Sequence, residues 1–215
     1  MKKVLFVIFL LGTAIWSYAQ TVKEYFVTDN PIAFDNTHFY LGWSSNPSKG
    51  YFLHEYFPKG ETPEQFNKMF TVSIVETGIS AKDAAMAKAN ELTKRKENDN
   101  ICNYKVYENG GEYIVDFLVS DIANGQLTTV EWNIHYYKDI EIDGKHYSQL
   151  VFYSQRAYGD NIVPFIKSLS EISSEKILAL ANINLVVKAL KWFKESMGQR
   201  FWSEPQSSLQ FFIPL

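Results

Sequence analysis

Alternating apolar and polar residues in the second half of the chain predict a series of strands. A period of two is typical of a strand that turns one face to a core. The segments with this pattern are residues 103–107, 112–119, 127–137 and 147–155. Turn-forming residues separate them, namely Asn109-Gly110-Gly111 and Asp143-Gly144. Consecutive strands with short turns between them predict an antiparallel sheet.

Three shorter segments in the first half also resemble strands. They are residues 38–43, 51–57 and 71–75, which are rich in aromatic or β-branched residues. The remainder of residues 20–50 is expected to be irregular.

Two helices are expected between these segments. Thr62 followed by Pro63 and Gln65 is a typical helix start and predicts a short helix over residues 63–70. Ser80 with Asp83 predicts a second helix that runs to residue 96.

The C-terminal third of the chain is expected to be helical. Asp160 is a candidate cap for a helix to residue 169, in which Pro164 is tolerable only in the first turn. A long helix is expected from Ser173 or Ser174 to Met197, with a wide apolar arc that something must cover. Packing on its own domain is favoured over a homodimer interface through residues 177–193 or a membrane surface.

These elements predict an α+β fold. A central antiparallel sheet of about five to seven strands is flanked by helices, and the long C-terminal helix packs on the domain. The expected organisation is a signal peptide at 1–19, an α+β domain at 20–172, and a helix with an apolar tail at 173–215 on the same domain.

The N-terminus predicts export. Lys2 and Lys3 precede an apolar run over residues 4–11, and Ser17-Tyr18-Ala19 places small residues at a cleavage site. This is the pattern of a secretory signal peptide, and the apolar run is short for a membrane span. The mature protein is therefore expected to be soluble, periplasmic or extracellular, and without a transmembrane anchor.

Charge and cysteine content narrow the expected partners. The net charge is −3, and cleavage would remove two lysines and no acidic residue. Nucleic acid is therefore not an expected partner. Cys102 is the single cysteine, so an internal disulfide is excluded, and a buried thiol is favoured over a catalytic one.

Sequence motifs for catalysis or metal binding do not emerge. His54-Glu55 lacks the second histidine of a zinc-protease helix, and residues 42–46 lack the closing glycine of a nucleophile elbow. We expect no metal and no cofactor, and no residue is assigned a catalytic role.

One group of polar residues on the predicted sheet is a candidate ligand site. By alternation, Glu131 and His135 share one face of their strand, and Arg156 and Tyr158 end the neighbouring strand. A carboxylate and an imidazole can transfer protons, and a guanidinium can bind an anion. A solvated polar face that only stabilises the sheet is the favoured alternative. Asp116 also interrupts an otherwise apolar strand.

Two segments resemble those of an uncharacterised family of exported bacterial proteins. They are the Pro58-Lys59-Gly60-Glu61 strand-to-helix segment and the Arg156-Ala157-Tyr158-Gly159-Asp160 corner. The order of elements is also similar to that of the PsbP-like α/β/α sandwich. Neither resemblance implies a site or an activity.

The expected function is that of an exported envelope protein that binds an unknown protein or small ligand without catalysis. The alternatives are a hydrolase that uses Glu131, His135 and Arg156, and an assembly subunit that dimerises through its last helix. The sequence leans against an enzyme because the catalytic motifs are missing.

Overall fold

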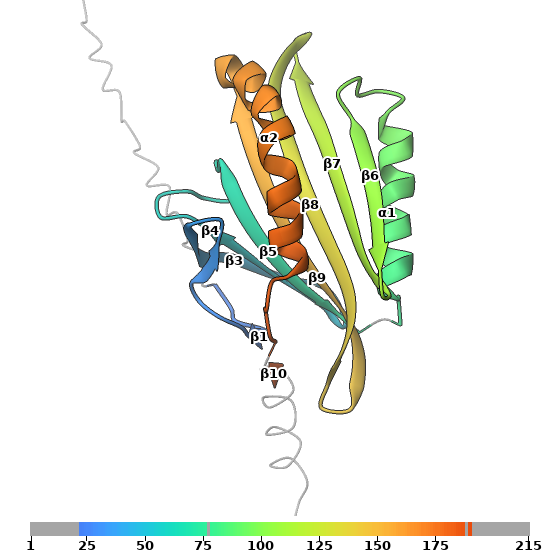
Figure 1. Cartoon of the computed structure of the whole chain (residues 1–215). Coiled ribbons are helices and arrows are strands. Elements are labelled where there is room, and N and C mark those ends of the chain that lie inside the picture. The colour runs from blue at the N-terminus through green and yellow to red at the C-terminus, as the bar shows by residue number, and fades with distance from the viewer. Residues whose placement is uncertain (1–21, 77, 188, 191–215) are drawn as a thin grey trace, which may run out of the picture.

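The computed structural model describes residues 22–76, 78–187 and 189–190, and the predicted signal peptide lies outside them. One eight-stranded antiparallel sheet dominates the fold (Figure 1), in the order β2-β3-β4-β5-β9-β8-β7-β6. Its strands are β2 (Ile32–Phe34), β3 (Thr37–Ser48), β4 (Tyr51–Phe57), β5 (Lys68–Val75), β6 (Asn103–Asn109), β7 (Glu112–Ala123), β8 (Gln126–Ile142) and β9 (Lys145–Tyr158). A separate two-stranded pair joins β1 (Phe26–Val27) to β10 (Ala189–Leu190).

The predicted fold class was wrong in its proportion of strand to helix and in its number of strands. The sheet has eight strands rather than five to seven, and the described chain contains more strand than helix. The missed strands lie mainly in residues 20–50, where β3 extends through Asn46-Pro47-Ser48, which reads as a turn. The pairing with β4 shifts register between Ser45 and Ser48, and a bulge of this kind accommodates a proline that cannot donate a ladder hydrogen bond.

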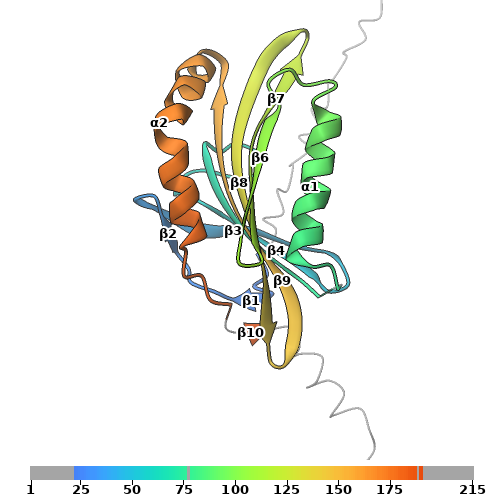
Figure 2. The same ribbon diagram turned by 45° about the vertical axis from the view of Figure 1, so that its right-hand side comes forward.

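Two helices lie on opposite faces of the sheet, as Figure 2 shows. Helix α1 (Ala81–Arg95) packs on β6, β7 and β8, and α2 (Ile162–Ala181) packs on β7, β8 and β9. The helix predicted after Ser80 is confirmed, because the Ser80 hydroxyl accepts the N–H of Asp83 at 3.1 Å. Small side chains allow close contact with the sheet, since Ala81 and Ala85 are fully buried.

Most of the core lies on the α2 face of the sheet. Phe34 of β2 and Phe70 of β5 pack there with Trp132 of β8 and Tyr153 of β9. Leu180 of α2 belongs to the same cluster. The α1 face has a smaller core built from Leu92, Val115, Phe117 and Tyr137. Because both faces are covered across β7 to β9, these strands alternate between two apolar cores rather than between core and water.

The helix predicted over residues 63–70 does not form. The Thr62 hydroxyl does accept the N–H of Gln65, at 3.3 Å. The backbone N–H groups of Asn67 and Lys68 do not continue a helix, because both donate to the Glu61 carboxylate, at 2.8 and 2.9 Å. The chain then enters β5, whose ladder with β4 and β9 replaces helical hydrogen bonds.

The long C-terminal helix was wrong in its extent. A short 3₁₀ turn over Gly159–Asn161 leads directly into α2, which passes through the predicted start at Ser173 and ends at Ala181. Pro164 is its third residue, where no N–H is needed. Asn182 ends the helix by donating from its side chain to the Leu178 carbonyl at 2.8 Å, and residues 182–187 are not helical. Residues 191–215, which include the predicted apolar tail, lie outside the described residues.

Candidate functional site

The four residues predicted as a ligand site do not form one site. Glu131 lies directly opposite Arg156 across β8 and β9, and the two side chains form an ion pair. His135 lies two rows further along the same face, about 13 Å from Glu131 at the usual rise of a strand. Asn133 and Ser154 occupy the row between them and bond to each other at 2.6 Å. Proton transfer between Glu131 and His135 is therefore not a property of this geometry.

His135 is part of the core under α1. Its ring stacks on Phe152 with centroids 3.6 Å apart and meets the edge of Phe117. Its Nδ1 lies 3.2 Å from the Tyr137 hydroxyl. Burial lowers the pKa of His135 well below its usual value, and the nearby charge of Lys88 acts in the same direction. The imidazole is thus a neutral packing residue.

Arg156 and Tyr158 hold the loop between β4 and β5. The Arg156 guanidinium lies 4.0 Å from the centre of the Phe66 ring, and the Tyr158 hydroxyl donates to the Phe66 carbonyl at 2.8 Å. The main chains also meet, because the Arg156 N–H donates to the Asn67 carbonyl at 2.9 Å. The Arg156–Asp160 corner therefore packs against the loop that follows the Pro58-Lys59-Gly60-Glu61 segment, and these contacts are structural.

Glu55 adds a second carboxylate near this ion pair. Burial raises the pKa of Glu55, Arg156 opposes this, and Glu131 adds to it. The group lies on the same sheet face as Glu131, through the register of β4, β5, β9 and β8. The positive charge of Arg156 is already shared with Glu131, so this cluster has limited capacity to bind an anion.

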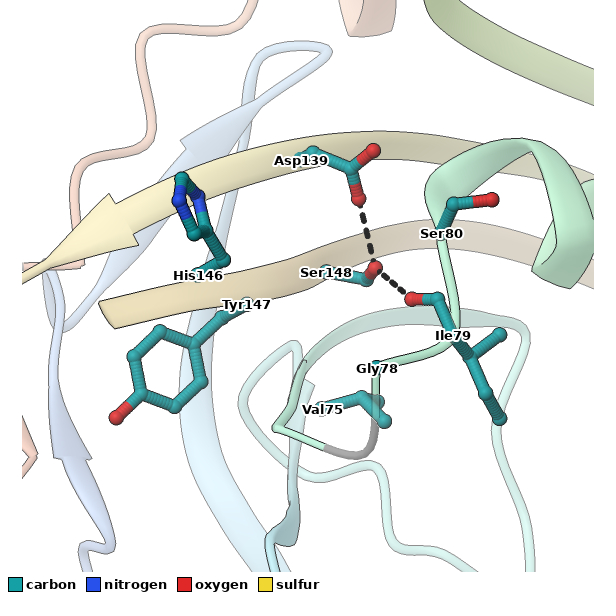
Figure 3. Close-up of a pocket in the computed structure, with 8 residues that line it drawn as sticks. All are labelled: Val75, Gly78, Ile79, Ser80, Asp139, His146, Tyr147 and Ser148. Atoms are coloured by element: carbon teal, nitrogen blue, oxygen red, sulfur yellow. Dashed lines mark hydrogen bonds between the residues drawn. The ribbon is translucent and has the colours of Figure 1, made fainter.

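A cavity of about 240 Å³ at the start of α1 gathers serine, histidine and aspartate side chains (Figure 3). The Ser148 hydroxyl lies 2.5 Å from the Ile79 carbonyl oxygen and 2.8 Å from Asp139 Oδ1. The same Asp139 oxygen accepts the N–H of Ala81 at 2.9 Å. Figure 3 draws no hydrogen bond from His146 to either group. These groups fix the start of α1 to the sheet and do not form a nucleophile–base pair.

The most promising site is a groove between α2 and the edge of the sheet, which we call the α2–β6 groove. Two cavities lie along it, of about 230 and 310 Å³. The first is lined by Asn103, Tyr104, Lys105, Asp116, Phe117, Leu118, Trp132, Leu169, Ser170 and Ser173. The second is lined by Tyr107, Glu108, Asn109, Glu112, Ile114, Tyr136, Leu178, Ala181 and Asn182. The rings of Tyr104 and Phe117 belong to the α1 face, so Trp132 supplies the aromatic surface of the first cavity. Tyr107 and Tyr136 supply that of the second, and aromatic surface beside a few polar groups is typical of ligand sites.

Asp116 is the central polar group of the first cavity. Its carboxylate accepts the indole N–H of Trp132 at 2.6 Å. Burial raises the pKa of Asp116, whereas the Trp132 hydrogen bond and the charge of Lys105 lower it. A partly desolvated carboxylate beside an indole can bind a cation or a hydrogen-bond donor more strongly than an exposed one.

The second cavity also combines carboxylates with aromatic side chains. Glu108 and Glu112 supply further carboxylates, while Tyr107 and Tyr136 supply aromatic surface. Leu178 of α2 completes the wall and is 63% exposed. The groove as a whole therefore suits an elongated ligand with an apolar body and a cationic or donor group.

Two kinds of feature are absent from the residues that the structure describes. These residues contain no group of three or more histidine, cysteine, aspartate or glutamate residues placed to hold a metal ion. Among these same residues, no helix has the length and hydropathy needed to cross a membrane.

The sequence pointed to one groove residue and missed the others. Asp116 stands out as an acid within an apolar strand. The sequence predicts strands that contain Trp132, Tyr136, Lys105 and Tyr107, but it marks none of them as a site residue. Only the position of α2 over β7 and β8 shows that these residues surround one groove.

Comparisons with known proteins support a family and no more. A protein-family model matches residues 26–185, which covers nearly all of the described chain. No curated protein and no solved structure gave a match. The resemblance to the PsbP-like sandwich is therefore not confirmed.

Proposed function

The chain belongs to an uncharacterised bacterial family, and from this premise and the α2–β6 groove we propose that it is an exported, non-catalytic binding protein. The observation that carries the proposal is the half-buried Asp116 carboxylate in an aromatic groove. The ligand is an elongated molecule with an apolar body and an amine or hydroxyl group that reaches Asp116. A periplasmic or extracellular location follows from the signal-peptide pattern of residues 1–19.

Native mass spectrometry of protein purified from its own host tests this proposal. We expect a bound small molecule on the wild-type protein and its loss in Asp116→Asn. Because burial raises the pKa of Asp116, its ionised form opposes folding above about pH 4, the ordinary aspartate pKa. Asp116→Asn should therefore keep or increase the free energy of unfolding while it abolishes the ligand peak.

Asp143→Asn is the matched control, because Asp143 is an exposed turn residue with a positive φ that asparagine also adopts. It should retain the ligand. A ligand peak that survives Asp116→Asn would reject the groove as the binding site. The same spectra test export, because the mass should correspond to a chain that begins at Gln20.

The hydrolase alternative is not part of this proposal. Glu131 and His135 lie far apart on the sheet, and the His135 ring is enclosed by Phe152 and Phe117.

A further inference from the structure

The edge strand β6 is open to a further strand. It is the last strand of the sheet and pairs only with β7 among the described strands, in an unbroken register from Asn103↔Leu118 to Asn109↔Glu112. All its residues except the half-buried Tyr104 are exposed. Its outer row of backbone N–H and C=O groups therefore faces solvent along seven residues.

The two edges of the sheet differ in how they are protected. The opposite edge, β2, has three residues, and Ile32 and Phe34 are buried in the core. Strand β6 is longer and has neither a proline nor a register shift. Val106 and Tyr107 remain 37% and 42% exposed on its two faces. Proteins normally protect such an edge with prolines, bulges or charged residues. Strand β6 carries the charged residues Lys105 and Glu108 but no proline or bulge, and its exposed apolar side chains make it suited to docking.

We propose that β6 pairs with β6 of a second copy of this chain, in an antiparallel register centred on Val106. A two-fold axis normal to the sheet keeps each face of β6 on the same side in both copies. Residue numbers that face each other across this axis add to a constant, so Lys105 lies opposite Tyr107 and Tyr104 opposite Glu108. Asn103 then lies opposite Asn109, and the whole strand is paired.

Side-chain complementarity selects this register. An axis at Val106 opposes no like charges and sets an ammonium group beside an aromatic ring on each side. An axis at Lys105 would place two lysines opposite each other. An axis at Tyr107 would leave two residues of each strand unpaired. The second copy of the chain is thus a well-matched occupant of its own edge.

The dimer would join the two α2–β6 grooves. Because the axis is normal to the sheet, both α2 helices lie on one side of the extended sheet and both α1 helices on the other. Lys105 and Tyr107, which line the groove of one copy, then lie beside Tyr107 and Lys105 of the other copy, next to the axis. An interface of one strand pair is small, in the range below roughly 1,200 Å² that is typical of weak and reversible complexes.

Sedimentation velocity over a range of concentrations tests the proposal on protein purified from its host. Wild-type protein should move from monomer to dimer as the concentration rises. Val106→Lys places two ammonium groups opposite each other and should raise the dimer Kd at least about ten-fold. Val106→Glu should do the same, whereas the neutral β-branched Val106→Thr should retain the dimer. An equimolar mixture of the Lys and Glu variants should dimerise again, which excludes misfolding as the cause.

Disulfide trapping tests the register. Val106→Cys should form a covalent dimer under oxidising conditions, because each new thiol faces its own counterpart. Glu108→Cys should not, because it faces Tyr104. A wild-type protein that stays monomeric at all concentrations, or a Val106→Lys variant that dimerises as well as wild type, would overturn the proposal.

Discussion

Asp99 illustrates how single polar residues hold this fold. It follows α1 and accepts hydrogen bonds from the Ser120 amide and hydroxyl, both at 2.7 Å, and from the Ile101 and Cys102 amides. The Arg95 guanidinium donates to it at 3.0 Å. Burial alone would raise the pKa of Asp99, but the bonds from Ser120 and Arg95 outweigh this and lower it.

Asp99→Asn should therefore destabilise the protein, because an amide offers one acceptor oxygen where the carboxylate offers two. We expect the free energy of unfolding at pH 7 to fall by about 2–3 kcal/mol, measured by urea denaturation. The folded-state pKa lies below the unfolded value of about 3.9, so the wild-type contribution is complete above that pH. It should be lost as the pH falls through the folded-state pKa, and the variant should lack this acid-dependent loss.

Asp121→Asn is the control, because the Asp121 side chain is 74% exposed and also contacts Arg95. It should change the free energy of unfolding by less than about 0.5 kcal/mol. An equal loss in both variants would show that Arg95, rather than the buried carboxylate, stabilises this corner.

The alternation of side chains between the two faces of a strand could be predicted from the sequence. Which part of a face is covered by a helix could not. The shared face of Glu131, Asn133 and His135 follows from the period of two and is what the structure has. That α1 covers the His135 end of this face depends on where a distant helix packs. For this reason the same pattern suggested a polar site although one of its members is a core residue.

At the level of elements, sequence signals for helix caps and turns predicted the structure correctly where hydrogen bonds between neighbouring residues determine it. The Ser80 cap and the Asn109-Gly110-Gly111 turn were predicted correctly, since each depends on neighbouring residues. The helix expected over residues 63–70 failed because the strand ladder and the Glu61 carboxylate compete for the same amides. The ladder between β5 and β9 joins distant segments and is not visible in a local window of sequence.

The loop that replaced this helix gives the next prediction. Phe66→Ala should lower the free energy of unfolding by about 3 kcal/mol, because it removes a buried ring from beneath Arg156. Tyr158→Phe should lower it by about 1 kcal/mol, because it removes the hydrogen bond to the Phe66 carbonyl. Thermal or urea unfolding measures both.

Tyr40→Phe is the matched control, since Tyr40 is 37% exposed and its change should have little effect. If Tyr158→Phe leaves stability unchanged but removes the bound ligand, Tyr158 belongs to a binding site, as the sequence suggested, and not to the loop anchor.

At the level of the whole molecule, the order of the strands in the sheet could not be predicted from the sequence. The hairpin neighbours β6 to β9 could be predicted from short turns, but the pairing of β5 with β9 joins segments about 80 residues apart. That long-range pairing creates one continuous sheet and places β6 and β2 at its edges. The α2–β6 groove and the open edge both follow from it.

The last prediction distinguishes two surfaces for self-association. The sequence favoured packing of the last helix on its own domain and left a dimer through residues 177–193 as an alternative. Leu180 and Leu185 are buried in the core of their own chain. Leu178 is the large hydrophobic residue of α2 that is exposed in this range. Leu178→Glu should therefore leave the dimer Kd unchanged, while it weakens ligand binding because Leu178 lines the groove. If Leu178→Glu abolished the dimer and Val106→Lys did not, the α2 surface would be the interface and β6 would be excluded.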